Sequence, residues 1–277
     1  MPTVADTLRA ATVLGVDRLD AQLLLLHALG RGPGERAWLL AHDGDALSEH
    51  TASALEALFL RRTAGEPVAY LVGEKEFFGL PLQVDARVLV PRPDTETLVD
   101  WALDLLPADA PAAVVDLGTG SGAIALAIAR HRPQAAVDAV DASEAALAVA
   151  RNNAARLGPA VRFFHGDWLA GAPEPLYTLI VSNPPYIAEG DSHLPALAHE
   201  PTSALTAGAD GLDDIRVIVR DAPARLAPGG WLLLEHGWDQ AAAVRALLAG
   251  AGLEEVQSRT DLGGIERCSG ARLAGHR

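Results

Sequence analysis

The sequence predicts a doubly wound α/β domain that follows a small helical bundle, with a β-hairpin joining the two. Three observations support this architecture. After Pro111, short apolar runs alternate with longer helical segments, which is typical of a mostly parallel sheet flanked by helices. Before residue 74, apolar residues instead recur at helical spacing. Between these regions lie short strand-like pieces separated by Gly, Pro and Asp.

Residues 1–73 form the predicted helical domain. In DAQLLLLHALG, the apolar residues share one helix face and Gly30 follows as a stop signal. A second helix is expected to begin after the candidate N-cap Ser48 and to end near Gly65 and Pro67. The expected buried positions of the two helices are Leu24, Leu25, Ala28, Leu29, Leu55, Leu58 and Phe59.

Residues 74–92 are predicted to form the hairpin linker, and residues 93–277 the α/β domain. The linker contains strand-like pieces at 77–78, 82–84 and 88–90. A helix is expected to start from Asp94, with Leu98, Trp101, Ala102 and Leu105 on its buried side.

Strands and helices then alternate to the C-terminus. The expected strands are 113–117, 136–140, 161–165, 176–182, 230–235 and 253–257, with a further strand around Cys268. The expected helices are 123–130, 144–157, 211–226 and 239–251.

The composition excludes several classes of protein. The 277 residues carry a formal net charge of −14, from 22 basic and 36 acidic residues, so a broad phosphate-binding surface is not expected. Cys268 is the single cysteine, and the nine histidines lack metal-ligand spacing, so we expect neither a disulfide nor a metal site. The sequence has no run long enough to span a membrane and no signal-peptide pattern, which favours the cytoplasm.

A glycine-rich loop follows the first strand of the α/β domain, in the segment VVDLGTGSG. Gly118, Gly120 and Gly122 allow a tight turn and a close approach to a ligand at the start of the next helix. A dinucleotide and S-adenosylmethionine both suit such a loop, and a purely structural turn is a third interpretation. Asp116, two residues before Gly118, favours S-adenosylmethionine because its carboxylate can hold the methionyl ammonium group.

The next two strands also end in polar residues. Asp141 can accept hydrogen bonds from both ribose hydroxyls, although Asp141 or Ser143 can equally cap the following helix. Asp167 can accept from the adenine amino group and Trp168 can cover the ring, although Gly-Asp-Trp alone is an ordinary loop sequence.

The fourth strand ends in Asn-Pro-Pro-Tyr, which faces the predicted position of the cofactor's reactive end. The Asn183 side chain and the Pro184 carbonyl offer two acceptors at a spacing that suits a planar –NH2 group. Tyr186 offers a flat face for stacking, and Pro185 stiffens the turn. The turn can therefore hold an amide or an exocyclic amine with its nitrogen aimed at a methyl group.

Together these motifs resemble the class I amino-methyltransferases. The (Asp/Asn)-Pro-Pro-(Tyr/Phe) motif is shared by adenine-N6 methylases of nucleic acid and glutamine-N5 methylases of protein. The segments GEPVAYLVGEKEFFGLPLQVDARVLVPRPDTE, HEPTSALTAGADGLDDIR and DLGGIERCSGAR resemble the PrmC/HemK family, which methylates the glutamine of the Gly-Gly-Gln motif in peptide chain release factors. The resemblance covers nearly the whole chain and is looser over about the first 60 residues.

The resemblance implies a seven-stranded sheet whose last strand is antiparallel, and an N-terminal domain that docks the release factor. It implies S-adenosylmethionine as cofactor and S-adenosylhomocysteine as product. Arg92 and Glu200 match family positions near the active site, with a plain salt bridge as the alternative. Cys268-Ser269 departs from the β-branched pair expected there. The residues implied to contact the cofactor are Gly118, Thr119, Gly120, Ser121, Gly122, Asp141, Trp168 and Asn183, and those implied to hold the glutamine are Asn183, Pro184, Pro185 and Tyr186.

Three other functions stay open at this point. An adenine-N6 methyltransferase acting on DNA or RNA shares the catalytic turn, but the acidic charge disfavours it. An NAD-dependent oxidoreductase explains the glycine loop and leaves Asn-Pro-Pro-Tyr unexplained, and a binding protein on this fold is the third. For the leading interpretation, a glutamine methyltransferase of release factors, we expect a monomer that binds class 1 release factors and does not bind nucleic acid directly.

Overall fold

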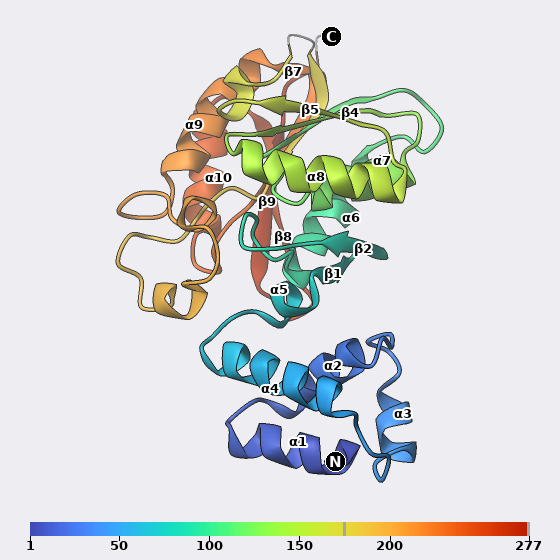
Figure 1. Ribbon diagram of the computed structural model, residues 1–277. Coiled ribbons are helices and arrows are strands. Elements are labelled where there is room, and N and C mark those ends of the chain that lie inside the picture. Colours follow the sequence, from blue (N-terminus) through green and yellow to red (C-terminus); the bar gives the residue numbers. More distant parts are fainter. Residues whose placement is uncertain (174–175, 276–277) are drawn as a thin grey trace. The chain divides into compact units, whose positions relative to one another are not determined.

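The computed structural model describes residues 1–173 and 176–275, which form two compact units (Figure 1). The first unit consists of Met1–Glu74 together with Pro195–His199, and the second of Lys75–Leu194 and Glu200–Arg277. The short segment Pro195–His199 therefore clusters with the N-terminal helices although the chain around it belongs to the second unit.

The first unit is a helical bundle around a leucine-rich core. Ser48 caps the longest of its helices, because its hydroxyl accepts the backbone N–H of Thr51 at 3.1 Å, and this prediction is confirmed. Leu24, Leu55 and Phe59 are almost fully buried in the core. The helices are α1 (Val4–Val13), α2 (Arg18–Ala28), α3 (Arg36–Ala41), α4 (Glu49–Thr63) and α5 (Val68–Val72).

The expected hairpin is present as a two-stranded sheet of β1 (Glu74–Phe77) and β2 (Leu80–Gln83). The third strand-like piece, at 88–90, was predicted wrongly. Val88 and Val90 are buried as a strand residue would be, but the Val90 N–H bonds to the Glu200 carboxylate at 3.0 Å instead of to a neighbouring strand. The apolar residues at 88–90 therefore reflect burial of this segment and not a strand.

The second unit contains a seven-stranded sheet in the order β5-β4-β3-β6-β7-β9-β8 within the described residues. Only the pairings made by β9 are antiparallel, which confirms the predicted mostly parallel sheet. The strands are β3 (Ala113–Leu117), β4 (Ala136–Asp141), β5 (Val161–His165), β6 (Tyr177–Ser182), β7 (Leu226–Glu235), β8 (Glu254–Thr260) and β9 (Glu266–Arg272).

The helices of this unit match the predicted segments with one marked difference. The predicted helix 211–226 is shorter in the structure, where α9 ends at Asp221 and a 3-10 turn, Ala222–Ala224, leads into β7. Pro223 lies in that turn, and its missing N–H cannot continue an α-helix. The helices are α6 (Glu96–Leu105), α7 (Ala123–His131), α8 (Glu144–Leu157), α9 (Asp213–Asp221) and α10 (Ala241–Gly250).

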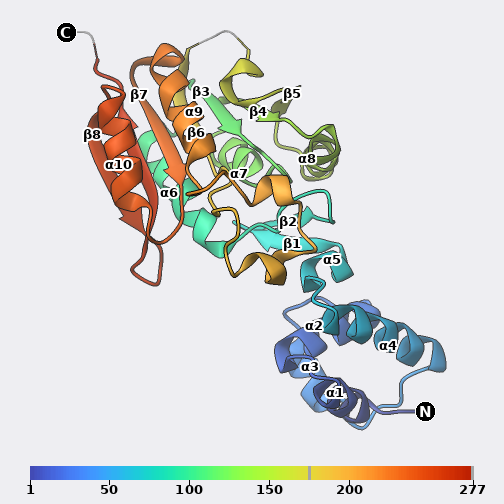
Figure 2. The ribbon, with the colours of Figure 1, turned by 90° about the vertical axis from the view of Figure 1, so that its left-hand side faces the viewer.

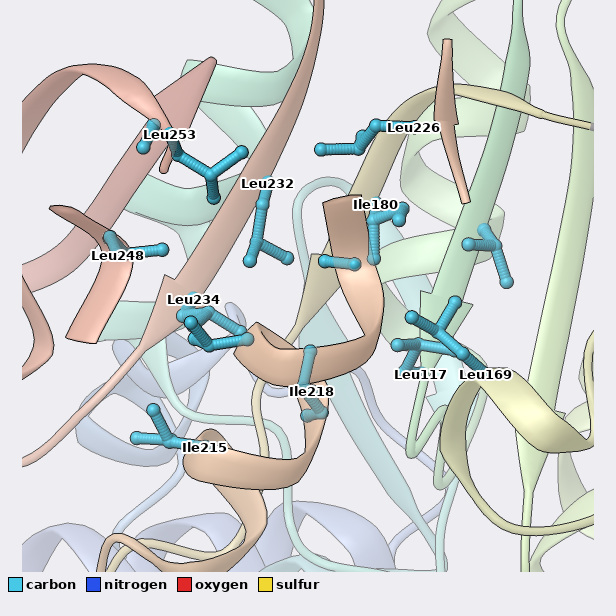
Figure 3. Close-up of a cluster of buried hydrophobic side chains, with 14 of the residues drawn as sticks. Leu117, Leu169, Ile180, Ile215, Ile218, Leu226, Leu232, Leu234, Leu248 and Leu253 are labelled. Atoms are coloured by element: carbon cyan, nitrogen blue, oxygen red, sulfur yellow. The ribbon is translucent and has the colours of Figure 1, made fainter. Parts of the chain in front are cut away.

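Helices cover the sheet in the doubly wound manner (Figure 2). On one face lie α9 and α10, and α10 packs against β9 and β8 at one edge of the sheet. Figure 3 shows Ile215 and Ile218 of α9 and Leu248 of α10 in one apolar cluster with strand residues such as Leu232. Leu117 of β3 belongs to this cluster, whereas the preceding Asp116 contacts α7 on the opposite face. Because successive side chains of a strand point to opposite faces of the sheet, Leu117 and Asp116 have different surroundings although both lie just before the glycine loop.

Candidate active site

The register of the sheet places the four predicted site loops next to one another. Leu117 of β3 pairs with Val140 of β4 and with Ser182 of β6, so Gly118, Asp141 and Asn183 leave adjacent strand ends. The β3–β6 junction is also where the strand order reverses, which is where open α/β sheets bind ligands.

A cavity of about 400 Å³ lies at these strand ends. Part of its lining had not been predicted from the sequence. These residues are Arg87, Val88, Leu89, Ala142, Ala146, Gly166, Pro201, Ser203, Ala204 and Asp214. Asp116, Thr119, Ser121, Gly122, Pro184 and Tyr186 were also predicted to contact a ligand, and they are not among the residues that line this cavity. The predicted residues that line it are Gly118, Gly120, Asp141, Asp167, Trp168, Asn183 and Pro185.

The glycines of the loop are required by its backbone and by its neighbours. Gly118, Gly120 and Gly122 have φ of 71°, 56° and 85°, values that other residues rarely adopt. A Cβ added at Gly118 would lie 3.1 Å from the Trp168 ring. The glycine therefore allows the indole to pack against the loop at the cavity wall.

Asp141 connects two of the loops. Its Oδ2 accepts the Gly120 N–H and its Oδ1 accepts the Ser143 N–H, each at 2.8 Å. Burial raises the pKa of this carboxyl, and the two backbone N–H donors oppose that shift. Ser143 rather than Asp141 caps α8, since its hydroxyl accepts the Ala146 N–H at 3.2 Å. Asp141 thus stays at the cavity wall in a fixed orientation.

Replacing Asp141 with alanine should weaken cofactor binding first. The substitution removes both an acceptor for the cofactor's hydroxyls and the carboxylate that holds Gly120 in place. Because hydrogen bonds to charged groups contribute about 1.5–3 kcal/mol, the Kd for S-adenosylmethionine should rise about 10- to 100-fold. Calorimetric titration measures this, and an unchanged Kd would remove Asp141 from the binding site.

Asp116 is fully buried and only partly satisfied. Its Oδ2 accepts the Thr119 hydroxyl at 2.6 Å and the Ala125 N–H at 3.2 Å, while Oδ1 has no hydrogen-bond partner in the described part of the chain. Burial raises the pKa of Asp116 to about 7. A cation bound beside it would supply the missing partner and favour the ionised carboxylate.

Trp168 is held in an unusual backbone conformation. Its φ is 44°, a left-handed value that costs a residue with a large side chain some strain. Burial raises the pKa of Asp214, and an interaction with the Trp168 side chain opposes that shift. Asp214, on α9, lines the cavity together with Trp168, and its position far along the chain gave no local signal.

The Asn-Pro-Pro-Tyr turn is fixed by contacts on several sides. The Asn183 Nδ2 donates to the Thr95 hydroxyl at 3.2 Å, which leaves its Oδ1 available as an acceptor. The Tyr186 hydroxyl donates to Glu235 Oε1 at 3.2 Å, and the Tyr186 carbonyl accepts from Gln240 Nε2 at 2.9 Å. Both prolines are buried, and their rings restrict the backbone of the turn.

Glu235 is buried behind this turn, where burial raises the pKa of its carboxyl to about 7. Hydrogen bonds from Thr95 and Tyr186 lower this pKa, the Asp94 charge raises it, and the Arg267 charge lowers it. The carboxyl therefore takes up its negative charge at a pH well above the usual range for glutamate.

This raised pKa predicts how stability depends on pH. With a folded pKa of about 7 and an unfolded value near 4.5, the stability that the neutral carboxyl contributes is present below about pH 4.5 and lost as pH rises through 7. Glu235→Gln cannot ionise, so from about pH 5 to about pH 8 it should gain about 2–3 kcal/mol in free energy of unfolding relative to the wild type. Urea denaturation at both pH values measures this, and a difference independent of pH would contradict it.

Arg92 and Glu200 form an ion pair in which Glu200 is buried. Glu200 also accepts the Val90 N–H, so the pair holds the end of the linker segment in place. Among residues 1–173 and 176–275, no group of three or more His, Cys, Asp or Glu is placed to hold a metal ion. Within the same residues, no helix is both long and apolar enough to cross a membrane.

Comparison with known proteins agrees with this geometry. A family model described as a methyltransferase small domain matches residues 96–242, and one described as the PrmC N-terminal domain matches residues 3–73. The crystal structure of a methyltransferase from Pyrococcus furiosus shares the fold, with a TM-score of 0.56 at 21% identity over 80% of this chain and 98% of that one.

Two curated relatives are much more similar. A release factor glutamine methyltransferase of Bordetella pertussis is 54% identical, covering 94% of this chain and 96% of its own. That of Burkholderia pseudomallei is 50% identical, covering 99% and 97%. Fold, cavity and comparisons define a class I S-adenosylmethionine-dependent methyltransferase. Within that class, the chain belongs to the release factor glutamine methyltransferase family.

Proposed function

We propose that this protein transfers a methyl group from S-adenosylmethionine to the side-chain amide nitrogen of the glutamine in the Gly-Gly-Gln motif of class 1 peptide chain release factors. The observation that carries the proposal is the Asn-Pro-Pro-Tyr turn, whose Asn183 lines the same cavity as the glycine loop. The identity to release factor glutamine methyltransferases over nearly the full chain supports the choice of substrate.

The residues present suit S-adenosylmethionine. Asp141 is placed to accept from the ribose hydroxyls, and Trp168 with Asp167 lies where the adenine would be covered and bonded. Asp116 lies two residues before Gly118 and its Oδ1 has no hydrogen-bond partner among the described residues, so we assign it to the methionyl ammonium group, although its side chain does not line the cavity. When bound, the cofactor supplies an electrophilic methyl group on a sulfonium whose sulfide leaves easily.

The protein's own contribution is to hold the glutamine amide. Asn183 Oδ1 and the Pro184 carbonyl accept the two amide N–H bonds, which directs the nitrogen lone pair at the methyl group. The nitrogen–carbon bond forms as the sulfur–carbon bond breaks, and one amide proton then leaves to solvent. The enzyme needs no strong base, since acceptors on the amide protons make the nitrogen more nucleophilic.

We also propose that the protein acts as a cytoplasmic monomer, with its N-terminal helices docking the release factor. The proposed substrate belongs to the translation apparatus, which supports the proposed compartment. Light scattering with size-exclusion chromatography tests the monomer, and a dimer mass would contradict it.

The function is tested by incubating the purified protein with methyl-labelled S-adenosylmethionine and a release factor. One glutamine in the Gly-Gly-Gln motif should gain a single methyl group, as mass spectrometry of the peptide can show. A release factor with that glutamine replaced by alanine serves as the matched control. No label on the glutamine despite measurable cofactor binding would refute the proposal, and label on DNA or RNA would favour an adenine-N6 methyltransferase.

A further inference from the structure

The side-chain carboxamide of Gln240, which lines no part of the cavity, holds the backbone of the Asn-Pro-Pro-Tyr turn. Gln240 Nε2 donates to the Tyr186 carbonyl at 2.9 Å and to the Asp210 carbonyl at 3.2 Å. Gln240 Oε1 accepts the Gly237 N–H at 2.8 Å. One side chain therefore joins three segments, namely the turn after β6, the segment that precedes α9 and the loop after β7.

We propose that Gln240 is a positioning residue for methyl transfer. By holding the Tyr186 carbonyl it fixes the end of the turn, and so it sets the place of the Pro184 carbonyl, one of the two proposed acceptors for the glutamine amide. The inference rests on the proposed function, since that amide is the group that the turn receives.

The two prolines make the turn depend on such contacts. Neither Pro184 nor Pro185 has a backbone N–H, so at these positions the backbone can be held only through carbonyl oxygens. Their rings also fix φ, which leaves the backbone between the Pro184 and Tyr186 carbonyls fewer torsions in which to absorb a displacement. A shift of the Tyr186 carbonyl is therefore passed on to the Pro184 carbonyl.

The partners of Gln240 give its carboxamide a single orientation. Both contacts of Nε2 end on carbonyl oxygens, which only accept hydrogen bonds. The contact of Oε1 comes from a backbone N–H, which only donates. Exchanging the two ends of the carboxamide would break all three hydrogen bonds, so the group is held in one place and in one sense.

Two further observations separate Gln240 from an ordinary residue at the start of a helix. It occupies the N-cap position of α10, yet its side chain forms no capping hydrogen bond with that helix, where Ser, Thr, Asp and Asn are the usual capping residues. Gly211 is packed against the same junction, because an added Cβ would lie 2.2 Å from the Tyr186 carbonyl oxygen and 2.8 Å from Gln240 Nε2. The glycine leaves the space in which the carboxamide meets the turn.

The first test compares Gln240→Met with Gln240→Glu. Methionine keeps the length of the side chain and removes all three hydrogen bonds, whereas glutamate keeps the shape and removes only the donors to the two carbonyls. Because a displacement of about 1 Å can cost about 100-fold in rate, both variants should lower kcat about 10- to 100-fold. The KM for the release factor and the Kd for S-adenosylmethionine should each stay within about 3-fold of wild type, since Gln240 lines no part of the cavity.

Asp239→Asn is the matched control. Asp239 is the exposed neighbour of Gln240, so this change should leave kcat within about 2-fold of wild type. Wild-type kcat in both Gln240 variants would overturn the proposal. Parallel losses of kcat, cofactor affinity and melting temperature in both would also overturn it, because that pattern indicates a purely structural role.

A crystal structure of Gln240→Met with S-adenosylhomocysteine provides a readout that does not depend on the substrate. The Tyr186 and Pro184 carbonyls should be displaced by about 1 Å or split between two positions there, and should have a single position in the wild type. An unchanged backbone at residues 184–186 would refute the positioning role. A displaced turn in a protein whose wild type methylates no release factor would instead refute the proposed function, and would leave Gln240 as the residue that holds the turn.

Discussion

Replacing Asn183 with alanine should lower kcat for methyl transfer by about 100- to 1,000-fold, the usual cost of removing one preorganised polar partner of a reacting group. The side chain lines the cavity, and its Nδ2 is already bound to Thr95, so its Oδ1 is the atom left for the substrate. The Kd for S-adenosylmethionine should change far less, because Asp141 and the glycine loop stay intact. Steady-state kinetics and calorimetry measure the two quantities separately.

Asn152→Ala is the matched control for this variant. Asn152 is exposed on α8 and bonds only to the Gln83 side chain among the described residues, so its loss should leave kcat within about 2-fold of wild type. Losses of equal size in kcat and cofactor affinity for Asn183→Ala would contradict the assigned role. They would mean that Asn183 serves the cofactor alone or that the variant is misfolded.

Gly211→Ala should produce the second large effect, although residue 211 bonds to no substrate. Gly211 has a φ of 72°, and an added Cβ would lie 2.2 Å from the Tyr186 carbonyl oxygen. That oxygen belongs to the backbone of the catalytic turn, so the turn must move to make room. Because a displacement of about 1 Å can cost about 100-fold in rate, kcat should fall by at least that order.

The control for Gly211→Ala is Gly252→Ala. Gly252 has a similar φ of 79° but nothing within 4 Å of the added Cβ, so it isolates the cost of the backbone conformation. It should lose about 1–2 kcal/mol of stability and keep its kcat. Chemical denaturation measures the stability of both variants, and steady-state kinetics measures their kcat. Equal kcat in the two would show that the contact between residue 211 and the turn does not affect catalysis.

Most of the sheet was predictable because its sequence signals are local. These signals are the spacing of apolar residues within each element and the glycines and prolines between elements. The strands 113–117 and 161–165 and the helix 144–157 were predicted with the bounds that the structure shows. Parallel strands bring their carboxyl ends to one edge, so the sequence order of the loops was enough to bring Gly118, Asp141 and Asn183 together.

The supporting residues were not predictable, because their roles depend on contacts between distant segments. Thr95 has the sequence position of a helix start, yet its hydroxyl accepts from Asn183 Nδ2, 88 residues further along the chain. Glu235 ends a strand, yet it accepts the Tyr186 hydroxyl. Asp214 has the sequence position of an ordinary first-turn acid of α9, although it lines the cavity together with Trp168. The pieces at 88–90 looked like a strand because burial and β-structure leave the same apolar pattern.

The central claim is that the Asn183 side-chain oxygen and the Pro184 carbonyl clasp a glutamine amide. The most direct measurement is a crystal structure of the protein with S-adenosylhomocysteine and a peptide containing Gly-Gly-Gln. The account predicts the glutamine amide nitrogen within about 2.7–3.2 Å of both oxygens and facing the sulfur. A glutamine bound elsewhere, or an Asn183 that presents its nitrogen to the substrate, would contradict the account.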